Sequence, residues 1–153
     1  MMKRILKLRR DKRGVATIEL ALFSPILASM IIGVVDMSNA YSRKLACEQA
    51  AQRAIEKVMQ TTGEETPAAT IISEASEQAG IDPSKVTVSY RLECDQVYVA
   101  DYDAECSTGQ KEARYIEVVV NDVYQPMFPL HFGSYNSDAG GYLISAKAGM
   151  RTQ

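Results

Sequence analysis

The chain has 153 residues, of which 46% are hydrophobic and 24% are charged, and its formal net charge is −2. This average hides a division, because residues 1–13 carry a net charge of +6 and the other 140 residues carry −8. The acidic part argues against a general nucleic-acid binder, since phosphate repels it, and its regular apolar patterning argues against intrinsic disorder. The 118 residues after position 35 suffice for one small core and are too few for a large enzyme.

A 21-residue apolar stretch, Val15 to Val35, follows the basic segment, and its only charged residue is Glu19. As a helix it would be about 31 Å long, which matches the hydrocarbon core of a bilayer at about 30 Å. We therefore expect a transmembrane helix over residues 15–35. The basic leader, residues 1–14, predicts a cytoplasmic N-terminus with the rest of the chain outside the cytoplasm. Pro25 removes a backbone hydrogen bond and should kink or locally loosen this helix.

Three interpretations of the apolar stretch compete. A secretory signal peptide has a shorter apolar region, of about 7–15 residues, and a small-residue cleavage motif that is not clear here. A plain membrane anchor explains the length but leaves Glu19 unexplained, because an ionised carboxylate in lipid costs on the order of a few kcal/mol. The third interpretation depends on the junction Arg13-Gly14-Val15-Ala16-Thr17-Ile18-Glu19, where a basic patch and a glycine precede four uncharged residues and a carboxylate.

This junction resembles the class III signal sequence of type IV prepilins. The resemblance implies that a membrane-embedded prepilin peptidase cuts after Gly14, so that Val15 becomes the N-terminus and Glu19 the fifth mature residue. The apolar helix would stay on the mature protein. Cleavage creates an α-ammonium group on Val15, about 6 Å along the helix from Glu19. The carboxylate could pair with that group in its own chain or in a neighbouring subunit, where such a pair could set the register of assembly.

Helical periodicity continues beyond the apolar stretch. Small and apolar residues recur at helical spacing between Ala40 and Val58, and no proline or glycine interrupts residues 34–62. We expect one helix that runs to about Thr61 and stops at Gly63. Its part outside the membrane, residues 36–62, should pack on a soluble domain.

That soluble domain should comprise residues 63–153. A second helix is predicted with Thr66 as N-cap, Pro67 at the first helical position and Gly80 as the C-terminal stop. After a turn at residues 81–84 the apolar period changes to two, which predicts three main strands and one short strand. The expected strands are 86–93, 115–124 and 142–150, with the short one within 97–102. The predicted fold is α+β and pilin-like: a small antiparallel sheet and a short second helix pack on the long N-terminal helix.

The three cysteines have different expected roles. Cys94 and Cys106 flank an 11-residue loop between predicted strands, and outside the cytoplasm such a pair persists as a disulfide. The bridge would stabilise the domain by roughly 2–3 kcal/mol on the chain-entropy model, and two free thiols are the alternative. Cys47 lies on the apolar stripe of the long helix, where we expect a buried, unreactive thiol.

The loop closed by these cysteines is acidic. Its carboxylates follow the start of a calcium loop, with Glu112 at the twelfth position. Cys106 stands where such a loop needs glycine, so a solvated acidic hairpin tip is the favoured interpretation. The carboxylates in question are Asp101, Asp103 and Glu105.

No catalytic, metal or cofactor motif occurs elsewhere. The sequence has no CxxC, P-loop, GxGxxG, HExxH or nucleophile elbow, and its one histidine, His131, has no serine or cysteine motif near it. We therefore expect a protein that is not an enzyme and that holds no cofactor.

Two blocks of sequence carry a closer resemblance to a known family. The first is Asp11-Lys12-Arg13-Gly14 through Glu19-Leu20-Ala21-Leu22 to Pro25. The second is Tyr115-Ile116-Glu117-Val118-Val119-Val120 through Tyr124, Pro126 and Pro129, then Leu143-Ile144-Ser145-Ala146. Together they resemble the TadE/TadG-like proteins of the tight-adherence (Tad/Flp) pilus system, most specifically in residues 9–35. One departure is Leu20, because the family's processing motif usually has an aromatic residue after the glutamate.

The resemblance implies a pseudopilin or minor pilin that is required to assemble an adhesive, biofilm-forming pilus. It implies a single-pass protein of the bacterial inner membrane with a periplasmic C-terminal domain. The implied partners are the prepilin peptidase, other pilin-like subunits, the inner-membrane assembly platform and lipid, and not nucleic acid. The alternative is a membrane-anchored extracytoplasmic binding module that is not processed. Whether the protein enters the fibre, primes or caps it, or stays in the membrane is left open.

Overall fold

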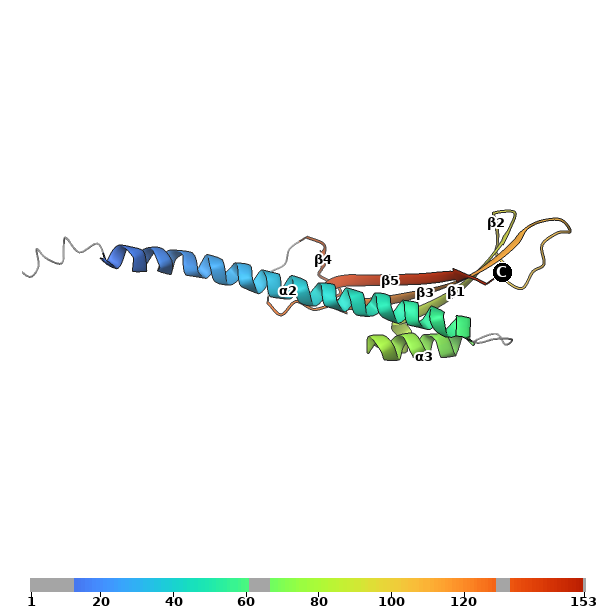
Figure 1. Ribbon diagram of the computed structural model, residues 1–153, viewed down its shortest axis with the longest axis horizontal. Coiled ribbons are helices and arrows are strands. Elements are labelled where there is room, and N and C mark those ends of the chain that lie inside the picture. Colours follow the sequence, from blue (N-terminus) through green and yellow to red (C-terminus); the bar gives the residue numbers. More distant parts are fainter. Residues whose placement is uncertain (1–12, 61–66, 129–132, 153) are drawn as a thin grey trace, which may run out of the picture. The chain divides into compact units, whose positions relative to one another are not determined.

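A computed structural model describes residues 13–60, 67–128 and 133–152 (Figure 1). The helical elements of these residues are the long helix α2 (Arg13–Gln60), the shorter helix α3 (Ala68–Ala79) and a 3-10 turn, η1 (Pro83–Lys85). The strands are β1 (Val86–Cys94), β2 (Val97–Val99), β3 (Glu112–Tyr124), β4 (Tyr135–Asn136) and β5 (Gly141–Arg151). The predicted α+β class is confirmed, including the long first helix, the short second helix and the antiparallel sheet.

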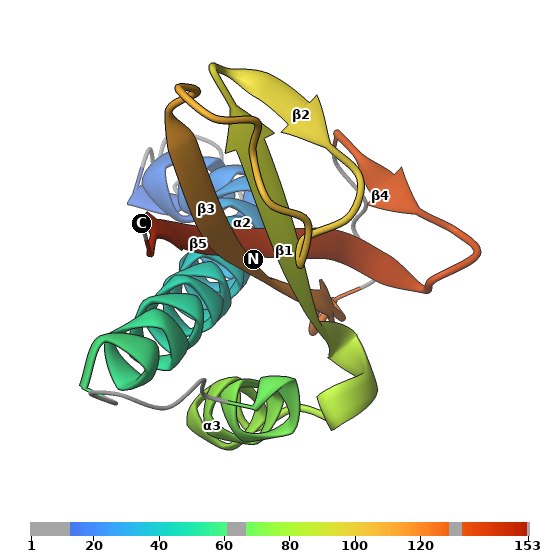
Figure 2. The ribbon, with the colours of Figure 1, turned by 90° about the vertical axis from the view of Figure 1, so that its right-hand side faces the viewer.

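The chain divides into two compact units between Ser38 and Asn39, and α2 contributes to both. The second unit contains all five strands, in the order β2-β1-β3-β5-β4, and every neighbouring pair is antiparallel. The central strand β3 pairs with β1 from Val120↔Val86 to Glu112↔Cys94, and with β5 on its other side. In Figure 2 the second half of α2 and α3 lie on the same side of this sheet.

The strands alternate between buried and exposed residues, as the period of two predicts. Buried positions on the inner face include Leu92 of β1, Val118 of β3 and Ile144 of β5. The same face holds the part-buried Tyr90, Tyr142 and Met150. Because side chains alternate across a strand, this register turns one apolar row of each strand toward the helices.

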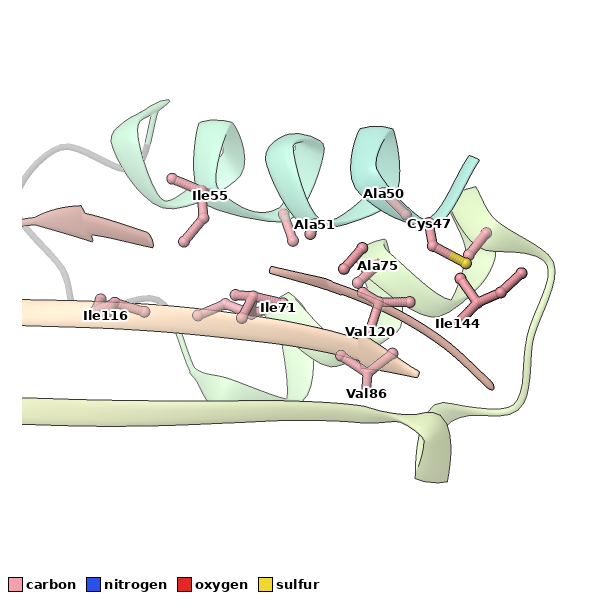
Figure 3. Close-up of a cluster of buried hydrophobic side chains, with 14 residues drawn as sticks. Cys47, Ala50, Ala51, Ile55, Ile71, Ala75, Val86, Ile116, Val120 and Ile144 are labelled. Carbon is pink, nitrogen blue, oxygen red and sulfur yellow. The ribbon is translucent and has the colours of Figure 1, made fainter. Parts of the chain in front are cut away.

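The core lies between the sheet and the two helices (Figure 3). The long helix contributes mainly small side chains to this core. In Figure 3, Ile55 lies toward the Ile116 end of the core and Cys47 toward the Ile144 end, so α2 runs antiparallel to β3. The buried residues of α2 are Cys47, Ala50, Ala51, Ala54 and Ile55.

The second helix agrees with the prediction except at its first residue. Pro67 has an extended conformation (φ −57°, ψ 139°) and is the N-cap, so the helix begins at Ala68 and the expectation that Pro67 is its first residue is wrong by one position. The Pro67 carbonyl accepts hydrogen bonds from the backbone N–H groups of Thr70 and Ile71. Gly80 ends the helix in the left-handed conformation, at φ 61°, where a residue with a Cβ atom would be strained.

Two further elements differ from the prediction or lie outside it. The turn at residues 81–84 contains η1, whose N-cap Asp82 accepts a hydrogen bond from the Ser84 backbone N–H at 2.9 Å. Hydrogen bonds from Ser84 hold the pKa of Asp82 below its ordinary value. The sequence also did not predict the short strand β4. The proposed roles of Gly63, Thr66 and His131, and most of the leader, fall outside the described residues.

Candidate functional site

The predicted processing site lies at the start of α2. Within the described residues α2 begins at Arg13, so Gly14 and Val15 are its second and third described residues. A Cβ atom built on Gly14 would meet no other atom within 4 Å. Packing within the described structure therefore does not require glycine at this position, and a requirement for it would have to come from something that binds the chain there.

Glu19 lies one helical turn after Val15. Within the described residues its exposed carboxylate makes no hydrogen bond or ion pair. The neighbouring Ile18 and Leu20 are also exposed, so the carboxylate stands on a helix surface that is otherwise apolar. An anionic group in that setting needs a cation, either from its own chain or from another molecule.

The apolar stretch of α2 is uncovered along its length. All but one of its large aliphatic side chains are exposed, including Val35, which is 45% exposed at the end of the stretch, while Ile32 is half-buried. The helix is long and apolar enough to cross a membrane, by length and composition, although signal sequences share those properties. Monomeric soluble proteins rarely expose apolar patches of this extent, so the stretch suits contact with lipid or with other apolar helices.

Pro25 lies within α2, and the helix continues through it without a break. Proline has no N–H group, so Pro25 cannot donate a hydrogen bond to the carbonyl of Ala21 four residues earlier. The hydroxyl of Ser24 donates a hydrogen bond to that same carbonyl oxygen at 3.3 Å. Serine side chains satisfy freed backbone groups in membrane helices in this way. The kink or local loosening expected at Pro25 stays a prediction.

In the second unit, Arg43 joins three elements. Its Nε atom lies 2.6 Å from Asp122 Oδ2 on β3, and Nη1 donates to the Ala79 carbonyl of α3 at 2.8 Å. The next residue, Lys44, forms an exposed ion pair with Glu48 at 3.3 Å. The Arg43 ion pair is less accessible, because both of its members are less than one-third exposed.

The predicted disulfide between Cys94 and Cys106 is present. Their Cα atoms are 5.6 Å apart, an ordinary separation for a disulfide. Cys47 is the free cysteine, and it is buried as expected.

The acidic loop inside this bridge folds around Arg114. The guanidinium donates to the carbonyl oxygens of Tyr102 and Ala104 and pairs with Glu112 at 2.6 Å. The Glu112 carboxylate, at the twelfth position of the calcium-like series, is therefore already paired with Arg114 of the same strand. Among the described residues, no group of three or more His, Cys, Asp or Glu side chains is placed to hold a metal ion.

Burial raises the pKa of the Cys47 thiol above its ordinary value, although nearby Arg43 opposes this. A raised folded-state pKa gives stability that is complete below the unfolded pKa, near about 8.5, and is lost as pH rises through the folded value. We expect the free energy of unfolding to fall above about pH 8.5, with a limiting slope of about 1.4 kcal/mol per pH unit. Urea titrations of the detergent-solubilised chain measure this slope. Cys47→Ala should remove that contribution, and an identical pH dependence in the variant would contradict it.

A shallow hollow of about 260 Å³ lies on the outer face of the sheet. In the register Tyr115 stands between Arg91 and Arg151, and the Arg91 guanidinium lies over the Tyr115 ring, 4.9 Å from its centroid. Gly149 deepens the hollow, since a Cβ atom there would come within 3.1 Å of the Ile116 carbonyl oxygen. A tethered binding module would hold its ligand in such a place.

Comparison with known protein families gives one match, to the family described as TadE-like protein, over residues 14–55. Comparisons with curated proteins and with solved structures give no match. The matched segment begins at the glycine of the predicted processing site and ends in the buried face of α2 at Ile55. It does not include residues 113–129, where the sequence resemblance is weaker. Residues 14–55 are therefore similar to the TadE-like family, as the resemblance of the N-terminal block predicts.

Proposed function

We propose that this protein is a pseudopilin or minor-pilin-like component needed to assemble a tight-adherence pilus, and that it is not an enzyme. A prepilin peptidase cuts after Gly14, and the apolar helix remains on the mature chain. The observation that carries the proposal is the combination of Gly14, Val15 and Glu19 at the start of an exposed apolar helix that is TadE-like. The basic leader makes the inner membrane, with a periplasmic C-terminal domain, the proposed location.

Glu19 has the central part in the assembly step. After cleavage, the α-ammonium of one subunit and the Glu19 carboxylate of another form an ion pair in lipid, where each charge alone would be costly. The pair is at the same depth in every subunit, so it sets the axial register of neighbouring helices. The partners are accordingly other pilin-like subunits and the assembly platform in the inner membrane.

Substitution of Glu19 tests this role. In cells that lack the chromosomal copy, Glu19→Ala should abolish surface pili, measured as sheared fibres, while immunoblots show normal amounts of the protein. Glu19→Gln should also fail, because it keeps the shape and loses the charge. Glu56→Ala, which removes an exposed carboxylate from the soluble half of α2, is the matched control and should keep piliation.

Normal piliation by Glu19→Ala cells would favour the alternative, an unprocessed binding module that α2 only tethers. That alternative is favoured by one observation, the hollow around Tyr115 on the outer face of the sheet. In that case Tyr115→Ala, and not Glu19→Ala, should impair function in cells.

A further inference from the structure

One end of the sheet gathers apolar and aromatic side chains, which we name the end patch. Its most exposed members are Met127, at 67%, and Phe128, at 37%, both in the connection that follows β3. Figure 1 shows β4 at this end of the sheet and β2 at the other end. The register adds a row of tyrosines across three strands. These are Tyr124, Tyr142 and Tyr135.

A contact with α2 fixes where this patch lies along the helix. The side-chain amide Nδ2 of Asn39 donates to Met127 Sδ at 3.6 Å, so the Met127 connection lies beside residue 39 of α2. Two residues after Asn39 on the same helix, Tyr41 is 63% exposed. The second unit begins at Asn39, so the end patch is the part of this unit next to the apolar stretch in the chain.

The distance to the membrane follows from the helix rise. The apolar stretch ends at Val35, and the four helical residues from there to Asn39 advance about 6 Å. The polar headgroup layer on each side of the hydrocarbon core is about 5–8 Å thick. Residues beside Asn39 are therefore at headgroup depth if residues 15–35 span the bilayer.

The side chains of the patch suit that depth. Val123 to Phe128 contains no charged residue, and the next residue before this segment, Asp122, is neutralised by its ion pair with Arg43. Tyrosine and phenylalanine are the kinds of residue that accumulate where hydrocarbon meets water, because one part of the site is apolar and the other is wet. The exposed apolar surface of Met127 and Phe128 gains from contact with acyl chains.

We propose that the end patch is a second membrane contact of this protein, in which Met127 and Phe128 insert at the headgroup–acyl boundary beside the point where α2 leaves the bilayer. The contact would hold the soluble unit against the lipid surface and restrict its rotation about the helix. It rests on the membrane span that is part of the proposed function, and it is independent of cleavage and of pilus assembly.

The chain has no tryptophan, so single substitutions provide fluorescent probes without background. The full chain carrying Phe128→Trp is reconstituted in phosphatidylethanolamine–phosphatidylglycerol vesicles in which part of the lipid carries bromine near the carbonyl end of an acyl chain. Phe23→Trp, in the apolar stretch, is the positive control. Tyr98→Trp, an exposed aromatic position on β2 at the far end of the sheet, is the matched negative control.

We expect bromolipid to quench Phe128→Trp and its emission to shift to shorter wavelength, while Tyr98→Trp keeps the emission of a water-exposed indole and is quenched by acrylamide. Met127→Trp should behave as Phe128→Trp does. If Phe23→Trp is quenched by bromine but Phe128→Trp and Met127→Trp match Tyr98→Trp, the membrane contact is wrong and the span stands. Shielding of both patch probes from bromine and acrylamide alike would assign the patch to a protein partner and overturn the proposal. An unquenched Phe23→Trp would overturn the span and this contact together.

Discussion

Arg43→Ala should lower the free energy of unfolding of the soluble unit by about 2–3 kcal/mol, because it leaves two part-buried acceptors without a donor. Asp122 is only 16% exposed, and the Ala79 carbonyl is at the C-terminal end of α3, where orphan carbonyls already concentrate negative charge. The substitution removes the ion pair to β3 and the hydrogen bond to α3 at once.

Urea unfolding of the detergent-solubilised chain, followed by the near-ultraviolet circular dichroism of its tyrosines, measures this loss. Lys44→Ala is the matched control, since the exposed Lys44–Glu48 pair should contribute only about 0–1 kcal/mol. Arg43→Lys should recover part of the loss, because one ammonium group cannot reproduce the planar donor pair of a guanidinium. If Arg43→Ala costs no more than Lys44→Ala, the three-element contact does not stabilise the fold.

Removal of the Cys94–Cys106 disulfide should have an effect of similar size, about 3 kcal/mol on the chain-entropy model. The bridge joins two residues 12 positions apart and closes the hairpin tip. Reduction therefore increases the conformational entropy of the unfolded chain more than that of the folded chain. The paired substitution Cys94→Ala/Cys106→Ala and dithiothreitol treatment of the wild type should lower the urea midpoint alike.

Dithiothreitol breaks the disulfide without removing the buried Cys94 side chain, so it distinguishes the effect of the bridge from the effect of Cys94 packing. Cys47→Ser should respond to dithiothreitol as the wild type does, because Cys47 takes no part in the bridge. A wild-type protein whose urea midpoint does not change on full reduction would show that the Arg114 contacts with Tyr102 and Ala104 hold the hairpin tip without the disulfide.

Local signals account for the elements that the sequence predicts well. The apolar period of 3.6 along residues 40–58 and the period of two in β1, β3 and β5 depend only on near neighbours, and each marks the face that is buried. Gly80 is equally local, since a left-handed residue is needed to end α3. The disulfide could be predicted because both cysteines flank one hairpin.

The contacts that the sequence did not predict depend on tertiary register or on short elements. Arg43 and Asp122 are 79 residues apart, so their pairing follows only once β3 is aligned antiparallel to α2. The two residues of β4 carry too little pattern to predict a strand. The hydrogen bond from Ser24 to the Ala21 carbonyl could have been predicted from the sequence. Pro25 leaves the carbonyl four residues before it without a donor, and that carbonyl lies three residues before Ser24.

The site itself divides in the same way. Gly14, Val15 and Glu19 of the predicted processing junction lie within six residues of one another, and the family match begins at Gly14. The end patch could not be predicted, because it brings Met127 beside Asn39 across 88 positions of sequence. The proposed membrane contact of this patch thus rests on the structure, whereas the apolar stretch of α2 is already evident in the sequence.

The mass of the mature chain tests the central claim most directly. Protein extracted from membranes of cells that contain a prepilin peptidase should begin at Val15, having lost the leader with its net charge of +6. Intact-mass and N-terminal peptide analysis should find this form in the wild type, and the full-length precursor in cells without the peptidase. A wild-type protein that retains Met1 and the whole leader in peptidase-containing cells would contradict the claim that this chain is processed as a prepilin.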